Sequence, residues 1–221
     1  MLARKDVWLL QELEITASGL PVSASEAGLK DQIEALSCSN RRLSWQVLRL
    51  KQAVTLARYA AGHDGLTGLA NRSLLLDRLE QAFLRSARSR KQVVLLLVDI
   101  DNFKSINDHF GHAAGDDLLR EVAGRLSDCV RRADTISRLG GDEFVIVLPD
   151  MEAATALNVA ERISEKVRDA LSAPYCIEGT VLQLTASIGV AAGCGPKVSC
   201  KDLLRQADAA MYRAKCVSRH A

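Results

Sequence analysis

The chain has 221 residues, enough for one domain of ordinary size plus an appendage. Hydrophobic residues make up 48% and charged residues 25%, a balance typical of a soluble globular protein. The 29 basic and 27 acidic residues leave a net charge of +2, so the strong basic field of a nucleic-acid-binding protein is missing. We therefore expect no nucleic-acid partner.

Nothing in the sequence predicts insertion into a membrane. The longest apolar run, residues 93–98, is far shorter than the roughly 20 residues of a membrane-spanning helix. The apolar residues 7–10 are followed at once by acidic side chains, unlike a signal peptide. The six cysteines show neither CxxC pairs nor zinc-ligand spacing. We expect a cytoplasmic protein with reduced thiols.

The N-terminal part is expected to be helical. Residues 1–22 hold a short helix-prone segment without an assigned role, and residues 23–26 form a capping box that predicts a helix start. From there apolar residues recur every seven positions. The two heptad positions hold Leu29, Leu36, Leu43, Leu50 and Ala57, and Ile33, Asn40, Val47, Val54 and Ala61.

This heptad pattern favours a parallel two-stranded coiled coil, in which Asn40 fixes register at some cost in stability. The alternative is a helix that packs along its own domain. Because the pattern holds for more than four heptads, we expect a homodimer. We assign residues 1–61 to a helical dimerisation and signalling segment and residues 62–221 to a catalytic domain.

The elements of the second part predict an α+β fold. Residues 62–71 are rich in glycine and short polar side chains and predict a linker. The apolar run at 92–98 is typical of a central strand covered on both faces. Alternating helices and strands around a hairpin indicate one largely antiparallel sheet. We expect helices at 72–89, 152–171 and 200–217, a helical turn at 102–108, and a strand at 182–192. Residues 110–116 lead into a further helix, which is expected to bury Leu119, Val122, Leu126 and Val130.

Residues 138–144, Arg-Leu-Gly-Gly-Asp-Glu-Phe, join two β-prone segments. The Gly-Gly pair predicts a hairpin with a type I′ turn, because both turn residues need φ > 0. Bare backbone at that turn leaves room for a ligand. Asp142 and Glu143 follow directly and are expected on opposite faces of the strand. An acidic hairpin tip in solvent is an equally simple interpretation.

A second acidic strand end, at Asp99 and Asp101, makes a metal site more plausible than a solvated tip. If the two strands are neighbours, Asp99, Asp142 and Glu143 converge, and clustered carboxylates need a cation. Oxygen ligands suit Mg²⁺, which also binds substrate phosphates.

Two features next to this cluster predict phosphate binding. The backbone N–H groups of residues 102–105 open a helical turn that can cradle phosphate oxygens. Lys215 and Arg219 are four residues apart on the last helix and can clamp a polyphosphate. Together with the carboxylates they indicate nucleoside triphosphate chemistry.

Five stretches carry a family resemblance through their order and spacing. They are DGLTGLANR (64–72), VDIDNFKSINDHFGHAAGD (98–116), RLGGDEF (138–144), LTASIGVA (184–191) and YRAK (212–215). The chain resembles the GGDEF-domain diguanylate cyclases over residues 64–219. The resemblance implies a palm-like α+β fold related to adenylyl cyclases and polymerases, and condensation of two GTP into cyclic di-GMP.

Carried over by position, the resemblance implies that Asp99, the backbone carbonyl of Ile100, Asp142 and Glu143 bind Mg²⁺ or Mn²⁺. It also implies that Asp142, with Glu143 beside it, accepts the proton of the 3′-hydroxyl. Activation of that hydroxyl by the metal is an equally good description at this stage.

Asn107 and Asp116 resemble the guanine readers of the family. A carboxylate at 116 can accept from guanine N1–H and the 2-amino group, which adenine lacks, so we expect GTP as substrate. Phe103 and Lys104 are implied at the phosphates, and His112 at the substrate. A structural histidine is an equally good interpretation of His112.

The family arrangement places one GTP in each of two facing domains, so the coiled coil would supply the second half-site. Arg131 and Asp134 form an RxxD at the offset of the family's inhibitory site, which implies cyclic di-GMP as product and inhibitor. Residues 205–208 also fit RxxD, without that position. Around Arg219 the sequence departs from the family's glycine and asparagine.

Two other functions stay open at this stage. One is an inactive domain that binds cyclic di-GMP or GTP, against which the intact Asp99, Asp142 and Glu143 argue. The other is a structural dimerisation protein, which would not need Asn107 and Asp116 together.

Overall fold

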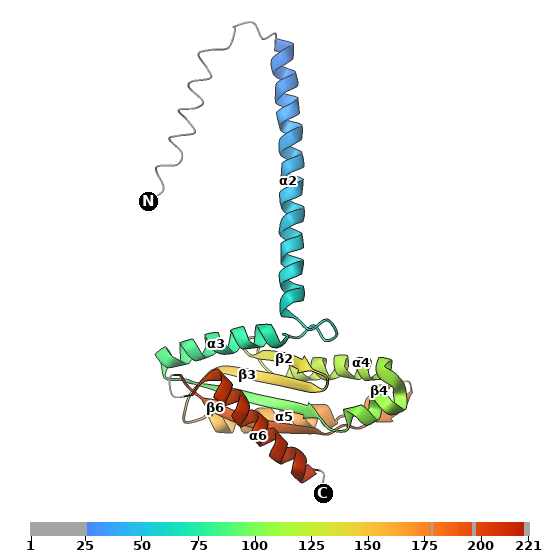
Figure 1. The fold of residues 1–221 in the computed structure, drawn as a ribbon, viewed down its shortest axis with the longest axis vertical. Coiled ribbons are helices and arrows are strands. Elements are labelled where there is room, and N and C mark those ends of the chain that lie inside the picture. Colours follow the sequence, from blue (N-terminus) through green and yellow to red (C-terminus); the bar gives the residue numbers. More distant parts are fainter. Residues whose placement is uncertain (1–25, 178, 196–197, 219–221) are drawn as a thin grey trace. The chain divides into compact units, whose positions relative to one another are not determined.

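The computed structural model describes residues 26–177, 179–195 and 198–218 (Figure 1). The chain is divided into two compact units, residues 1–56 and residues 57–221. The predicted capping-box residues 23–25, the segment 1–22 and Arg219 lie outside the described residues. The elements are α2 (Glu26–Gly62), α3 (Arg72–Ser89), β1 (Gln92–Ile100), α4 (Phe103–Cys129), β2 (Thr135–Gly140), β3 (Glu143–Met151), α5 (Ala156–Ser172), β4 (Tyr175–Ile177), β5 (Thr180–Leu182), β6 (Ala186–Gly193) and α6 (Cys200–Ser218).

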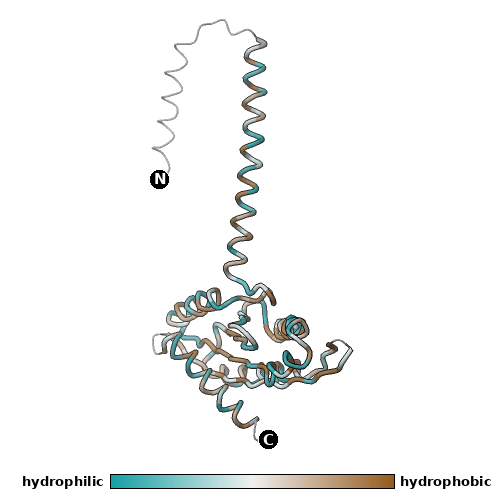
Figure 2. The backbone as a smooth tube through the Cα atoms, turned by 45° about the vertical axis from the view of Figure 1, so that its right-hand side comes forward, coloured by the Kyte–Doolittle hydropathy of each residue, from teal (hydrophilic) through white to brown (hydrophobic). Residues whose placement is uncertain are grey.

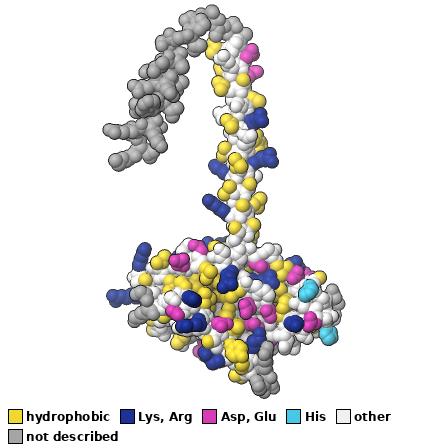
Figure 3. Space-filling view, in the orientation of Figure 1, with side chains coloured by type: hydrophobic (Ala, Val, Ile, Leu, Met, Phe, Trp, Pro, Cys, Tyr) yellow, Lys and Arg dark blue, Asp and Glu magenta, His cyan; other side chains and the backbone are white. Residues whose placement is uncertain are grey.

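Helix α2 is continuous over 37 residues and ends at Gly62, where the sequence predicts a break. Its heptad leucines face solvent in the single chain, with Leu36 70% and Leu50 65% exposed. Hydrophobic and hydrophilic positions alternate along the helix in Figure 2, and Figure 3 shows apolar and basic side chains side by side on its surface. A long helix with an exposed apolar seam is consistent with a coiled-coil stalk.

The main sheet has four strands in the order β2-β3-β1-β6, and every neighbouring pair is antiparallel (Figure 1). This confirms the predicted α+β class with a mostly antiparallel sheet. Strands β4 and β5 form a separate two-stranded sheet that the sequence patterns do not predict. The segment predicted as one strand at 182–192 is therefore divided: β5 ends at Leu182 and β6 begins at Ala186.

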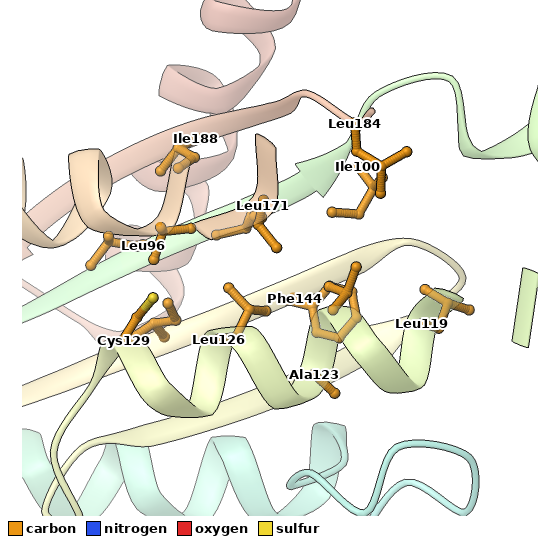
Figure 4. Packing of buried hydrophobic residues seen from close by; sticks show 14 of the residues in the cluster. Leu96, Ile100, Leu119, Ala123, Leu126, Cys129, Phe144, Leu171, Leu184 and Ile188 are labelled. Carbon is orange, nitrogen blue, oxygen red and sulfur yellow. The ribbon is translucent and has the colours of Figure 1, made fainter. Parts of the chain in front are cut away.

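Strand β1 is buried on both faces, as its apolar run predicts. Val94, Leu96 and Val98 join a core with α4 and α5. Figure 4 shows part of that core, with side chains of β1, β3 and the helices in contact. The alternate residues of β1 join a second core with α3 and α6, where Leu75 and Leu79 are fully buried. The sheet is thus covered by helices on both sides.

The linker 63–71 is closed by hydrogen bonds and attached to the sheet. Asn71 caps α3 by accepting from the Leu74 N–H, 3.0 Å away, and its amide donates to the Ala61 carbonyl. Ala70 forms a parallel bridge with Ser137 of β2. The linker is therefore an ordered joint between the end of α2 and the sheet.

Three predicted boundaries are wrong. Helix α5 begins at Ala156 rather than 152, because β3 continues to Met151, which pairs with Gln92. Helix α4 ends at Cys129, and Val130, which is predicted to be buried by this helix, follows in an extended conformation and is only half-buried. In the hairpin, Gly140 already pairs with Glu143, so Gly141 and Asp142 make the turn. Asp142 consequently lies at the tip rather than on the strand.

Among the described helices, none combines the length and the apolar character needed to cross a membrane.

Candidate active site

The ends of β1 and β3 bring two carboxylates together. Asp99 lies directly opposite Glu143 in the antiparallel register. The Asp99 side chain is only 7% exposed, and the Nζ of Lys215, on α6, lies 2.6 Å from its Oδ1. Like charges directly opposite each other destabilise a sheet, so this pair needs a positive partner. Lys215 is that partner here.

The electrostatics of the pair show excess negative charge. Burial raises the pKa of the Asp99 carboxyl, the bond from Lys215 works against this, and Asp142 adds to the rise. Burial also raises the pKa of Glu143, with contributions from Asp99 and Asp142. A nearby cation would stabilise the ionised form of carboxyl groups whose pKa is raised in this way.

The hairpin tip is tied to the end of β1 and to the linker. The Ile100 N–H donates to the Asp142 carbonyl, 3.2 Å away. Arg138 donates from Nε to the Gly141 carbonyl and forms an ion pair of 3.1 Å with Asp64 of the linker. Gly141 has φ = +54°, a conformation that glycine adopts without strain. Arg138 thus fixes this turn, a role that no local sequence pattern predicts.

A pocket of about 710 Å³ opens beside these groups, with Asp142 and Lys215 in its wall. Its floor is the turn from β1 into α4. Asn102 has φ = +58° and its carbonyl accepts from the Ser105 N–H, so the free N–H groups at the start of α4 belong to Phe103 and Lys104. A helix start with free N–H groups next to a lysine suits phosphate oxygens.

The predicted guanine readers lie on either side of a kink in α4 at Gly111, which has φ = +83°. A Cβ at Gly115 would lie 1.9 Å from Asn107 Oδ1, so the Asn107 side chain packs over Gly115. Asn107 is half-buried and the adjacent Asp116 is exposed. Asn107 thus packs against the residue that directly precedes Asp116 in the sequence. His112 follows the kink and is exposed.

The predicted inhibitory residues form a tight turn elsewhere on the domain. The Arg131 N–H donates to Asp134 Oδ2, 2.9 Å away, and the Asp134 N–H donates to the Arg131 carbonyl. Burial raises the pKa of Asp134. Both residues line a cavity of about 470 Å³ together with Arg78 and His63. This cavity shares no lining residue with the pocket of about 710 Å³ beside Asp142 and Lys215.

Among the described residues, no three Asp, Glu, His or Cys side chains are grouped as metal ligands, and Asp99 is paired with Lys215. The chemistry of the donor set nevertheless fits a divalent cation. Asp99 and Glu143 lie opposite each other, and burial, with smaller contributions from neighbouring carboxylates, raises the pKa of both. Carboxylate and carbonyl oxygens are the ligands that Mg²⁺ prefers.

The profile of the family described as "Diguanylate cyclase, GGDEF domain" matches residues 61–221, most of the chain. The chain belongs to the GGDEF diguanylate cyclase family. Among curated proteins it is similar to MucR of Pseudomonas aeruginosa, a bifunctional diguanylate cyclase and cyclic di-GMP phosphodiesterase, with 40% identity over 203 residues. That match covers 92% of this chain and 28% of MucR. The chain spans about a quarter to a third of the length of the curated relatives it matches.

Solved GGDEF structures share the fold. The coiled coil and GGDEF domain of DgcB from Caulobacter crescentus, in complex with c-di-GMP, matches with a TM-score of 0.75 and 30% identity, over 82% of this chain and 94% of that one. The diguanylate cyclase SiaD of Pseudomonas aeruginosa, in complex with its activator SiaC, matches with a TM-score of 0.67 and 31% identity, over 96% and 83%. Both matches cover more of this chain than the family profile, which matches residues 61–221, and the match to SiaD covers nearly all of it.

Proposed function

We propose that this chain is an active diguanylate cyclase that condenses two GTP into cyclic di-GMP and releases two pyrophosphates. The observation that carries the proposal is the pair Asp99 and Glu143, which lie opposite each other in the sheet, together with Lys215, which is bonded to Asp99 and lines a pocket beside a helix start. This is the set of groups that nucleotidyl transfer needs: carboxylates for a metal, N–H donors and a lysine for phosphates.

Asp99, Glu143, Asp142 and the carbonyl of Ile100 would hold Mg²⁺ or Mn²⁺. Such a cation, when bound, neutralises charge on the triphosphate and on the leaving pyrophosphate. Lys215 would then leave Asp99 for the phosphates, because a divalent cation replaces it as the carboxylate's partner. Phe103 and Lys104 would bind phosphate oxygens through their backbone N–H groups, and Arg219 would assist Lys215.

Asn107 and Asp116 would select guanine. Asp116 would accept from N1–H and the 2-amino group, and Asn107 would serve the other edge of the base. Adenine would leave the carboxylate without donors, which disfavours it by orders of magnitude. His112 directly follows the kink at Gly111, and we assign it to the substrate site with Asn107 and Asp116.

The reaction would take place between two copies of the chain. Each 3′-oxygen forms a bond to the partner's α-phosphorus while the bond from that phosphorus to pyrophosphate breaks, and the hydroxyl proton passes to Asp142. Catalysis consists mainly of positioning and charge neutralisation. The exposed heptad seam of α2 would supply the second half-site by forming a homodimer, with residues 1–61 as the pairing segment and 62–221 as the catalytic domain.

Arg131 and Asp134 would bind cyclic di-GMP and inhibit the enzyme from their own cavity. We expect Arg131→Ala to lose product inhibition while initial rates stay unchanged. Arg205→Ala, in the second RxxD sequence, is the matched control and should keep inhibition. Initial rates with added cyclic di-GMP measure both, and unchanged inhibition in Arg131→Ala would remove this site from the proposal.

The proposed activity is tested by incubating the purified chain with GTP and Mg²⁺ and resolving the products by mass. Cyclic di-GMP and pyrophosphate are expected. GTP that is bound but not converted would instead identify an inactive binding domain, and absence of GTP binding would leave only a dimerisation role.

A further inference from the structure

The carboxylate of Asp101 is held by two hydroxyl groups from the start of the edge strand β6. Thr185 Oγ1 donates to Asp101 Oδ2 at 2.7 Å, and Ser187 Oγ donates to Oδ1 at 2.8 Å. A third bond joins the backbones, since the Asp101 N–H donates to the Thr185 carbonyl at 3.0 Å. Ser187 is buried, so its hydroxyl is committed to this contact.

These three bonds lie at the base of the proposed phosphate site. Asp101 is followed by Asn102, whose positive φ starts the sharp turn into α4, and then by Phe103 and Lys104 with their free N–H groups. A non-glycine residue in the left-handed region costs free energy and persists only where its surroundings hold it. The bonds from β6 hold it, because they fix the residue immediately before it.

Strand β6 also supports helix α6, which carries Lys215 in the wall of the pocket. A Cβ at Gly189 would lie 2.1 Å from the Ala207 carbonyl oxygen and 2.2 Å from the Met211 nitrogen, so only glycine lets α6 pack this closely on β6. Lys215 lies one turn beyond Met211 on α6. The stretch 184–191 therefore supports both walls of the pocket, although none of its chemistry is used in the reaction proposed above.

We propose that Asp101, Thr185 and Ser187 are positioning residues that fix the N–H groups of Phe103 and Lys104 for the triphosphate of the nucleotide. The inference rests on the proposed function. Both oxygens of Asp101 already accept hydroxyl bonds, which separates this carboxylate from Asp99 as a candidate metal ligand. Its contribution is the geometry of the turn rather than a charge offered to the substrate.

The test compares two probes on the full chain: a GTP analogue with an uncleavable α,β-bond plus Mg²⁺, and guanosine, which has no phosphates. We expect Thr185→Val and Ser187→Ala to weaken binding of the analogue about tenfold and to leave the affinity for guanosine unchanged. Thr185→Ser keeps the hydroxyl and should restore binding. Thr180→Val, on the separate sheet, is the matched control and should bind like the wild type.

A double-mutant cycle separates positioning from direct ligation. If Thr185 acts through Asp101, the double variant Asp101→Ala, Thr185→Val should bind the analogue no more weakly than Asp101→Ala alone. Additive losses, or a loss in Asp101→Ala with none in either hydroxyl variant, would overturn the inference. Equal weakening for both probes would also overturn it, since that marks general damage. A wild-type chain that binds neither probe would overturn the proposed function itself.

Discussion

Helices α2 and α3 carry similar apolar periodicity but have opposite surroundings. Leu75 and Leu79 of α3 are fully buried against the sheet, whereas Leu36 and Leu50 of α2 are 70% and 65% exposed. The domain thus completes its core with its own residues, and the stalk does not. Apolar side chains repeated over this length gain by pairing with a second chain. Folding of the domain and pairing of two chains should therefore be separable, and the proposed reaction should need both.

The largest expected effect leaves both helices intact. Asp142→Asn should lower turnover about a thousandfold, because it removes a carboxylate that we assign to the metal and to the 3′-hydroxyl proton. The oligomeric state should not change. Asp150→Asn, at the exposed far end of β3, is the control and should turn over normally. Production of cyclic di-GMP from GTP measures both, and a fully active Asp142→Asn would contradict the assignment.

The next largest effect is expected from substitutions that disrupt only the pairing of α2. Leu36→Asn with Leu43→Asn places two amides in the heptad seam, so we expect monomers and a drop in turnover of about a hundredfold at micromolar protein. Rates per chain should then rise with protein concentration. Leu48 lies outside the heptad seam and is 46% exposed, so the control variant Leu48→Asn should stay dimeric. Sedimentation gives the oligomeric state and rate measurements on the same samples give the turnover. An active monomer would refute the need for pairing.

The reciprocal change breaks the domain core. Leu79→Ala should lower the free energy of unfolding by about 2–5 kcal/mol, because it leaves a cavity between α3 and the sheet. Leu84→Ala, on the exposed side of the same helix, should change it by no more than about 0.5 kcal/mol. Urea unfolding measures both. A loss of dimers in Leu79→Ala under native conditions would show that the two regions are not independent.

Much of this organisation could be predicted from local sequence patterns. The buried run of β1, the start of α3 at Arg72 and the break at Gly62 each depend on neighbouring residues, and each was predicted. The approach of Asp99 and Glu143 was predicted from two acidic strand ends, but other long-range contacts were not. Lys215 bonds Asp99 across 116 positions and Thr185 bonds Asp101 across 84, and periodicity says nothing about such pairs.

The shift of the hairpin turn has a similar cause. Arg138 holds the Gly141 carbonyl and the Asp64 carboxylate, which favours a turn one residue later than the Gly-Gly pair indicates. The β4–β5 hairpin was missed because its strands have only three residues each, too few for an alternating pattern to be recognised.

The smallest expected effect concerns the carboxylate pair. Without metal, Glu143→Gln should raise the free energy of unfolding at pH 7 by at most about 1 kcal/mol, since it removes a like charge opposite Asp99. The folded-state pKa of Glu143 is raised, so the wild type loses stability as the pH rises through the interval above the unfolded value. The gain should vanish below about pH 4. Mg²⁺ should stabilise the wild type more than the variant. Unfolding curves at both pH values, with and without Mg²⁺, check this; a less stable variant would contradict the repulsion.

A crystal structure of the full chain with Mg²⁺ and an uncleavable GTP analogue tests the central claim most directly. The account predicts the cation between Asp99 and Glu143, the triphosphate on the N–H groups of Phe103 and Lys104, and Lys215 moved from Asp99 to the phosphates. A nucleotide bound elsewhere, or a Lys215 still paired with Asp99 beside bound nucleotide, would contradict it.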